Sequence, residues 1–147
     1  MLRATLPLPA NHGKGKPFDR LTLTHDQRRL RRKVLTLPKG EEIMVDFPDA
    51  VTLEHFGGLL LEDGRIVEIV AAPEPLFEIT GRGGEHLSQL AWHIGNRHMS
   101  AQIEKKRILV PRDHVARTML TGLGAEVREV VETFSPERGA YHEHAAH

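Results

Sequence analysis

The strongest helical signal in this chain is GRGGEHLSQLAWHIGNRH, residues 81–98, and the fold class follows from what flanks it. Apolar residues recur at the i, i+3, i+4 and i+7 positions of one helical face, which are occupied by Leu87, Leu90, Ala91 and Ile94. We expect Gly95 and Asn96 to end this helix, because both residues tolerate the left-handed conformation of a C-cap. Trp92, the only tryptophan of the chain, is expected to belong to the packed helix, and His98 to lie beyond its end.

Strands and a second helix are expected around this first helix. In order along the chain, the flanking elements are a strand in LFEIT (76–80), one or two strands in SAQIEKKRILVP (100–111), a helix in HVARTMLTGL (114–123) and a strand in AEVREVVETF (125–134). Asp113 can N-cap the second helix, and Gly122 or Gly124 can close it. The order β-α-β-β-α-β predicts a ferredoxin-like domain over residues 75–134.

The N-terminal half is expected to be a small all-β domain over residues 1–74. Short apolar runs are separated by turn signals, and they read LTLT, KVLTL, EEIMVDF, VTL, GGLLL and GRIVEIV. LEDGR is a hairpin candidate, because Asp-Gly suits the positive φ angles of a tight turn. Residues 1–18 are rich in Pro and Gly, and we expect them to be mostly irregular. AAPEP, at 71–75, marks the domain boundary. The fold class is therefore α+β in two domains.

A tail completes the expected organisation. Residues 135–147, SPERGAYHEHAAH, carry Pro and Gly and show no periodicity, so we expect a mobile segment. It holds three of the chain's ten histidines: His142, His144 and His147.

Composition is that of an ordinary soluble protein, with 39% hydrophobic and 27% charged residues among 147. Cysteine is absent, which excludes disulfides and thiolate metal sites and fits a cytoplasmic protein. No apolar run reaches the 18 residues that a transmembrane helix needs, and the N-terminal apolar stretch is too short for a signal peptide.

The net charge is zero, but the charge is unevenly spread. Five of the six residues 28–33 are basic, whereas residues 41–63 contain seven acids and no Lys or Arg. We interpret the basic run as the solvated edge of a strand, where charges discourage pairing. The alternative is an adaptor that uses this run to bind an acidic protein surface or a phosphate backbone. No global footprint of a nucleic-acid-binding protein is present.

Motifs of an enzyme are missing, and we expect no catalytic activity. The chain lacks a Cys nucleophile, a G-x-S-x-G elbow and a phosphate-binding G-x-x-x-x-G-K-[ST] loop. Asp113 and His114 are neighbours, but a catalytic dyad there would need a third partner that the sequence does not supply.

Histidines make metal binding the chemistry to consider, because imidazole suits Zn, Cu and Ni. His98 lies at a bend just beyond a helix end, where a side chain can be exposed. His86 and His93 are i and i+7 on one helix, where a packed or hydrogen-bonded role is the more common one. His114 begins a helix and is open to either role. The tail histidines can fold onto a metal held elsewhere.

The motifs W-H-x-G-N-R-H, D-H-V and P-E-x-G-A-Y occur here in that order, and together they resemble the UreE urease accessory proteins, which are nickel metallochaperones. The resemblance covers nearly the whole chain. It implies a protein that delivers Ni(II), as cargo, to apo-urease during assembly of the urease metallocentre. Partners implied are a second copy, the urease apoprotein and the other urease accessory proteins including the GTPase, with no nucleic acid and no membrane.

The same resemblance assigns His98 as the principal nickel ligand, at a dimer interface where two copies meet. His114 and the tail residues His142, His144 and His147 are the implied additional ligands, and Zn(II) or Cu(II) is expected to substitute in vitro. Two positions depart from the family pattern: Gly58 replaces an acidic residue, and Arg112 stands at a place where some members have a further His.

Overall fold

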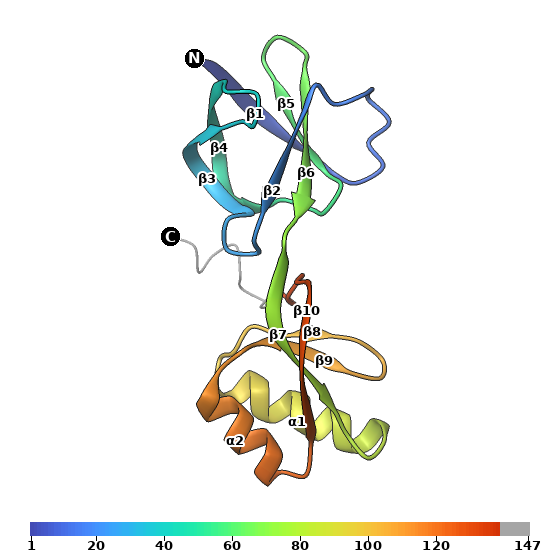
Figure 1. Ribbon diagram of the computed structural model, residues 1–147. Coiled ribbons are helices and arrows are strands. Elements are labelled where there is room, and N and C mark those ends of the chain that lie inside the picture. The colour runs from blue at the N-terminus through green and yellow to red at the C-terminus, as the bar shows by residue number, and fades with distance from the viewer. Residues whose placement is uncertain (139–147) are drawn as a thin grey trace. The chain divides into compact units, whose positions relative to one another are not determined.

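The computed structural model describes residues 1–138, which divide into two compact units (Figure 1). Unit 1 comprises residues 1–72, and unit 2 begins at Pro73. The predicted boundary followed residue 74; the observed one lies after Ala72, because a strand already begins at Pro73. No helix in the described part of the chain is long and apolar enough to cross a membrane.

Unit 1 is a six-stranded sheet and contains no helix among its residues, as predicted for an all-β domain. Its strands pair in the order β2-β6-β5-β1-β4-β3. Their bounds are β1 Leu2–Leu8, β2 Asp19–Leu23, β3 Arg29–Thr36, β4 Glu42–Thr52, β5 Gly58–Leu61 and β6 Ile66–Ala71. One cluster of buried side chains fills the core, with Ile43, Val45, Leu59 and Ile69 fully buried.

The expectation of an irregular segment over residues 1–18 is wrong for β1, which is an interior strand between β4 and β5. Leu2, Ala4 and Leu8 have the alternation of a strand, but the prolines hid it. Pro7 is tolerated because it lies near the strand's end, beyond a register shift. β4 likewise runs through Pro48, where the pairing with β3 is irregular.

The hairpin predicted for LEDGR is confirmed and joins β5 to β6. The amide of Gly64 donates to the carbonyl of Leu61 at 2.9 Å, and Gly64 alone in this turn takes a positive φ, 91°. Asp63 supports the turn differently, because its carboxylate accepts from the backbone and side chain of Arg65.

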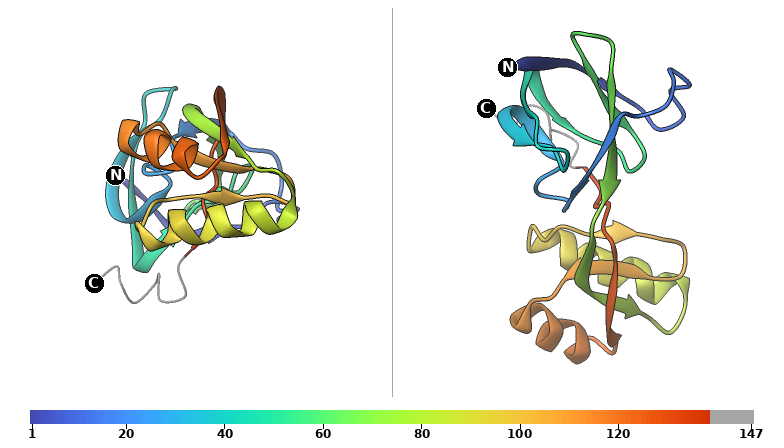
Figure 2. Two further views of the ribbon diagram at one scale, coloured as in Figure 1. Left: turned by 90° about the horizontal axis from the view of Figure 1, so that it is seen from below. Right: turned by 45° about the horizontal axis from the view of Figure 1, so that its top comes forward.

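Unit 2 has the order β7, α1, β8, β9, α2, β10 (Figures 1 and 2). The bounds are β7 Pro73–Thr80, α1 Gly84–Asn96, β8 Gln102–Ile103, β9 Ile108–Pro111, α2 His114–Gly122 and β10 Glu126–Thr133. The antiparallel sheet has the strand order β10-β7-β9-β8, which is the ferredoxin-like arrangement. The predicted fold class is confirmed.

Both helices of unit 2 pack on one face of this sheet. Leu90 and Ile94 of α1, with Leu120 of α2, share a buried cluster with Ile79 and Ile108 of the strands. The opposite face carries a smaller cluster of Leu76, Leu109 and Phe134, joined by Val130. Residues immediately after β10 are therefore held against the sheet.

Candidate functional site

α1 ends in a way that the sequence did not predict. Gly95 and Asn96 remain helical, so the expectation that they form the left-handed cap is wrong. The residue in the left-handed region is His98, with φ 58°. Its imidazole is exposed, as predicted.

The geometry around His98 is a Schellman motif. The amide of His98 donates to the carbonyl of Gly95 at 3.0 Å, and the amide of Met99 donates to the carbonyl of Ile94 at 3.3 Å. Met99 also packs against the buried cluster that contains Ile94, the apolar contact that accompanies this motif. The backbone that carries the His98 side chain is therefore fixed on both sides.

α2 ends in the same motif with the residue that the geometry prefers. Gly124, with φ 87°, donates to Thr121 at 3.0 Å, and Ala125 donates to Leu120 at 3.0 Å. His98 thus occupies the position that Gly124 occupies in the second helix. An L-residue with a Cβ in this conformation costs roughly 1–2 kcal/mol, whereas glycine does not pay this steric cost. Such strained positions cluster at functional sites.

Trp92 does not pack as expected. It is 65% exposed, and the half-buried ring of His93 stands perpendicular to its ring at a centroid distance of 5.1 Å. The apolar face of α1 is complete without Trp92, because Leu87, Leu90 and Ile94 already fill it.

His86 has the structural role predicted for it. Its Nδ1 accepts from the amide of Arg82 at 2.9 Å, and its Nε2 donates to the carbonyl of Leu123 at 2.9 Å. The buried ring therefore ties the segment before α1 to the end of α2. Both ring nitrogens are occupied, so no lone pair remains for a metal.

His114 is the exposed first residue of α2. The preceding Asp113 accepts from the amides of Val115 and Ala116, at 2.8 and 3.2 Å, which confirms the predicted N-cap. Arg112 is bound to the protein: it donates to two backbone carbonyls and pairs with Glu129 at 3.0 Å. Positions 112 and 114 are the two candidates for metal binding near the start of α2. Of these two, only position 114 carries an imidazole, and that side chain is exposed.

No group of three metal-ligating side chains comes together among residues 1–138. His98 and His114 each stand without two further donors there. His142, His144 and His147 lie outside the described residues.

The chain after β10 passes beside the segment that follows His98, which sequence reasoning missed. The amide of Ser135 donates to Oε1 of Gln102 at 2.8 Å, and the amide of Glu137 donates to the carbonyl of Ala101 at 2.7 Å. No periodicity marks these residues, because the contacts are made by backbone amides. The start of the predicted tail is thus bound three to four residues from His98.

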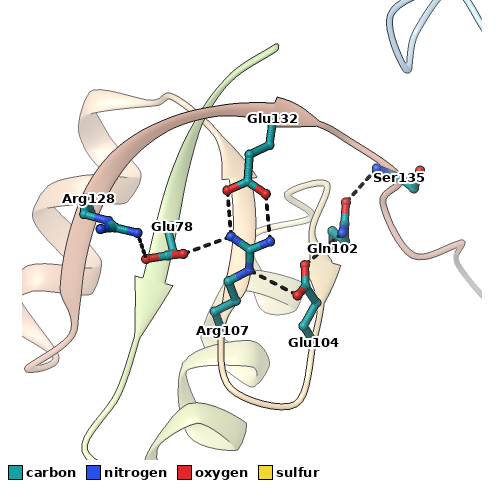
Figure 3. Close-up of polar contacts among 7 residues, drawn as sticks. All are labelled: Glu78, Gln102, Glu104, Arg107, Arg128, Glu132 and Ser135. Carbon is teal, nitrogen blue, oxygen red and sulfur yellow. Dashed lines mark hydrogen bonds and ion pairs between the residues drawn. The ribbon is translucent and has the colours of Figure 1, made fainter. Parts of the chain in front are cut away.

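A charged cluster formed by β7, β10 and the turn between β8 and β9 adjoins Gln102 (Figure 3). Arg107 donates to both oxygens of Glu132 at 2.7 Å, to Glu104 at 3.1 Å and to Glu78 at 2.9 Å. The hydrogen bonds from Arg107 lower the pKa of Glu132 below its usual value. Arg128 adds an ion pair with Glu78 at 2.9 Å.

The basic run of unit 1 is not one continuous surface. Arg28 is buried and donates to the carbonyl of Leu53 at 3.3 Å, and Arg31 donates to that of Pro48 at 3.3 Å. The remainder follows β3, which is an edge strand interrupted by a register shift before Arg32. A bulge and charges on an edge discourage strand pairing.

Gly58 lies where backbone and side chains crowd together. A Cβ there would stand 3.1 Å from the carbonyl oxygen of Val67 and 3.3 Å from a methyl carbon of Ile66. The position is buried, so a carboxylate there would need its neighbours to move.

Known proteins match the chain along its length. The family model described as UreE urease accessory protein, C-terminal domain, matches residues 74–147, and the N-terminal domain of the same family matches residues 3–72. The chain is 56% identical over 147 residues to the urease accessory protein UreE of Rhizobium rhizogenes, covering 100% of this chain and 88% of that one. The UreE of Agrobacterium fabrum is 52% identical, with 100% and 91% covered. The UreE 1 of Brucella suis is 57% identical over 125 residues, with 85% and 77% covered.

Proposed function

Because the chain belongs to the UreE family of urease accessory proteins, we propose that it is a nickel metallochaperone. It binds Ni(II) as cargo through His98 and delivers the ion to apo-urease, acting as a carrier and not as an enzyme. Its partners are a second copy of the chain, the urease apoprotein and the other urease accessory proteins including the GTPase, in the cytoplasm.

The observation that carries this proposal is the position of His98. Its imidazole is exposed, and two backbone hydrogen bonds hold the residue in a conformation that glycine would adopt more easily. Retaining a histidine at this cost fits a function for the side chain itself. Exposure suits a carrier, because the ion must both enter and leave.

One imidazole leaves most coordination positions of nickel to other donors. A two-fold axis beside His98 would bring the second chain's copy of the same residue opposite it, because an isologous interface repeats each residue. The tail supplies further imidazoles. Glu137 is bound to Ala101, three residues from His98. His142, His144 and His147, which lie outside the described residues, are the proposed donors of this tail.

His114 is an additional candidate ligand, because its side chain is exposed at the start of α2. Zn(II) and Cu(II) are expected to bind the same imidazoles in vitro, since the affinity of nitrogen ligands follows the Irving–Williams order. The alternative of an adaptor that binds through residues 28–33 is less well supported, because Arg28 is buried and Arg31 is bound to the backbone.

Calorimetric titration with nickel sulfate tests the assignment. In His98→Gly we expect the tight site to be lost with helix content preserved, because glycine suits the Schellman position. His93→Ala, on the same helix, is the matched control and should bind as the wild type does. Loaded wild-type protein should activate apo-urease in the presence of a chelator that removes free nickel. Unchanged tight binding in His98→Gly would refute the assignment.

A further inference from the structure

We propose that Phe56 and Glu54, in the loop between β4 and β5, form a docking site for a protein partner that presents a lysine or arginine side chain. The cation lies against the exposed face of the Phe56 ring and pairs with the carboxylate of Glu54. The inference rests on the proposed function, because a metallochaperone must dock on the proteins that receive its ion. The site belongs to unit 1 and binds no nickel.

Phe56 is held in a backbone conformation that bulky residues rarely adopt. Its φ is 63°, in the left-handed region that a Cβ disfavours. The amide of Phe56 donates to the carbonyl of Ile69 at 2.8 Å. Gly57, the next residue, accepts from the amide of Ile69 and donates to the carbonyl of Glu54, both at 2.9 Å. The loop is therefore fixed to β6, and it keeps a phenylalanine where glycine would fit more easily.

The fold makes little use of the Phe56 ring. Phe56 is 57% exposed and is not among the residues that pack against the core of unit 1. The ring of His55 lies beside it, at a centroid distance of 3.7 Å and a tilt of 31°. His55 is itself fixed, because its Nδ1 accepts from the amide of Ala71 at 2.9 Å. A strained aromatic residue that is held in place, exposed and unused by the core indicates a function for its side chain.

The charge beside Phe56 selects a cationic partner. Two other acids of the same acidic stretch, Glu41 and Asp63, already pair with Arg65. Glu54 is exposed, and its carboxylate makes no ion pair within the described part of the chain. A purely apolar partner that covered Phe56 would desolvate this carboxylate without pairing it, which is unfavourable. A lysine or arginine satisfies both groups, because the ring face and the carboxylate each attract a cation.

Binding to apo-urease assembled with its other accessory proteins tests the inference, with the metal-free, full-length chain immobilised for biolayer interferometry. Phe56→Gly removes the ring and suits the left-handed backbone. Phe56→Leu keeps the strain and the apolar character but has no aromatic face. Glu54→Gln removes the charge. Leu6→Ala is the matched control, because it truncates another exposed apolar side chain of unit 1.

We expect the Kd to rise about 3- to 30-fold in Phe56→Leu, the range that a cation–π contact covers, and at least as much in Phe56→Gly. Glu54→Gln should slow association and weaken its dependence on salt. Leu6→Ala should bind as the wild type does. The Tm of Phe56→Gly should stay within about 3 °C of the wild-type value, whereas a ring that only stabilised the fold would lower it further.

Wild-type binding by Phe56→Gly, an equal loss in Leu6→Ala, or no binding by the wild-type chain overturns the docking site. Wild-type binding by Phe56→Leu overturns the cationic partner and shows an apolar pocket in its place. Nickel titration of Phe56→Gly should give the wild-type affinity. The nickel site is tested by His98→Gly alone, so a failure of the proposed function is seen separately from a failure of this inference.

Discussion

Replacing His98 with glycine should make the metal-free protein more stable while removing its nickel site. The left-handed conformation costs an L-residue roughly 1–2 kcal/mol, and glycine avoids this cost. Glycine also makes the unfolded chain more flexible, which lowers the free energy of unfolding by about 0.5–1 kcal/mol. The expected net gain in the free energy of unfolding is about 0.5–1 kcal/mol. His98→Ala keeps the strained conformation and loses only an exposed side chain, so it should stay within about 0.5 kcal/mol of the wild type.

Thermal unfolding in the presence of a chelator, followed by circular dichroism at 222 nm, measures this difference. Both described helices lie in unit 2, so the signal reports the unit that contains His98. For a domain of this size, the gain corresponds to a rise in Tm of about 2–8 °C for His98→Gly. Equal Tm values for His98→Gly and His98→Ala would refute the reasoning, because they would show that position 98 carries no backbone strain.

Four further outcomes follow from the contacts of single residues. Asp113→Ala should destabilise unit 2 by about 1 kcal/mol in urea unfolding, because two amides of α2 lose their acceptor; Asp113→Ser should restore most of it. His86→Leu should cost about 2–3 kcal/mol by the same assay and leave nickel affinity unchanged, since it strands a donor and an acceptor. Gly57→Ala should lower the Tm of unit 1, measured by calorimetry, because its Cβ would stand 2.6 Å from the carbonyl oxygen of Leu8; an unchanged Tm would contradict that close approach. The pKa of Glu132 is lower in the folded protein than in the unfolded chain, so its ionised carboxylate stabilises the fold above about pH 4.5. This contribution is lost as the pH falls through the folded-state pKa. Between pH 7 and pH 4, Glu132→Gln should therefore lose less free energy of unfolding than the wild type in urea titrations.

The order of elements in unit 2 could be predicted from sequence because each signal is local. Periodicity marks α1, Asp113 marks the start of α2, and alternation marks β10. β1 could not be predicted, because proline opposes a strand locally and only the neighbouring β4 and β5 show that the position tolerates it.

The candidate site was predictable in part. The exposure of His98 was expected, but its left-handed conformation was not, because Gly95 and Asn96 are the residues with the local preference for it. The position of the cap is decided by which turn Met99 can close against the core, and that depends on tertiary packing. The anchors of Ser135 and Glu137 are invisible in sequence for the same reason: their partners are 33 and 36 residues away.

The sheet of unit 2 sets an order of events during synthesis. β7 pairs with β10 along its whole length, yet β10 is translated about 45 residues after β7. At about 5–20 residues per second, one edge of β7 stays unpaired for roughly 2–9 s. That strand carries two prolines, Pro73 and Pro75, and two carboxylates, those of Glu74 and Glu78. Prolines and charges keep an unpaired strand edge from pairing with another nascent chain. The sequence of β7 therefore protects the protein before it is folded as well as holding it together afterwards.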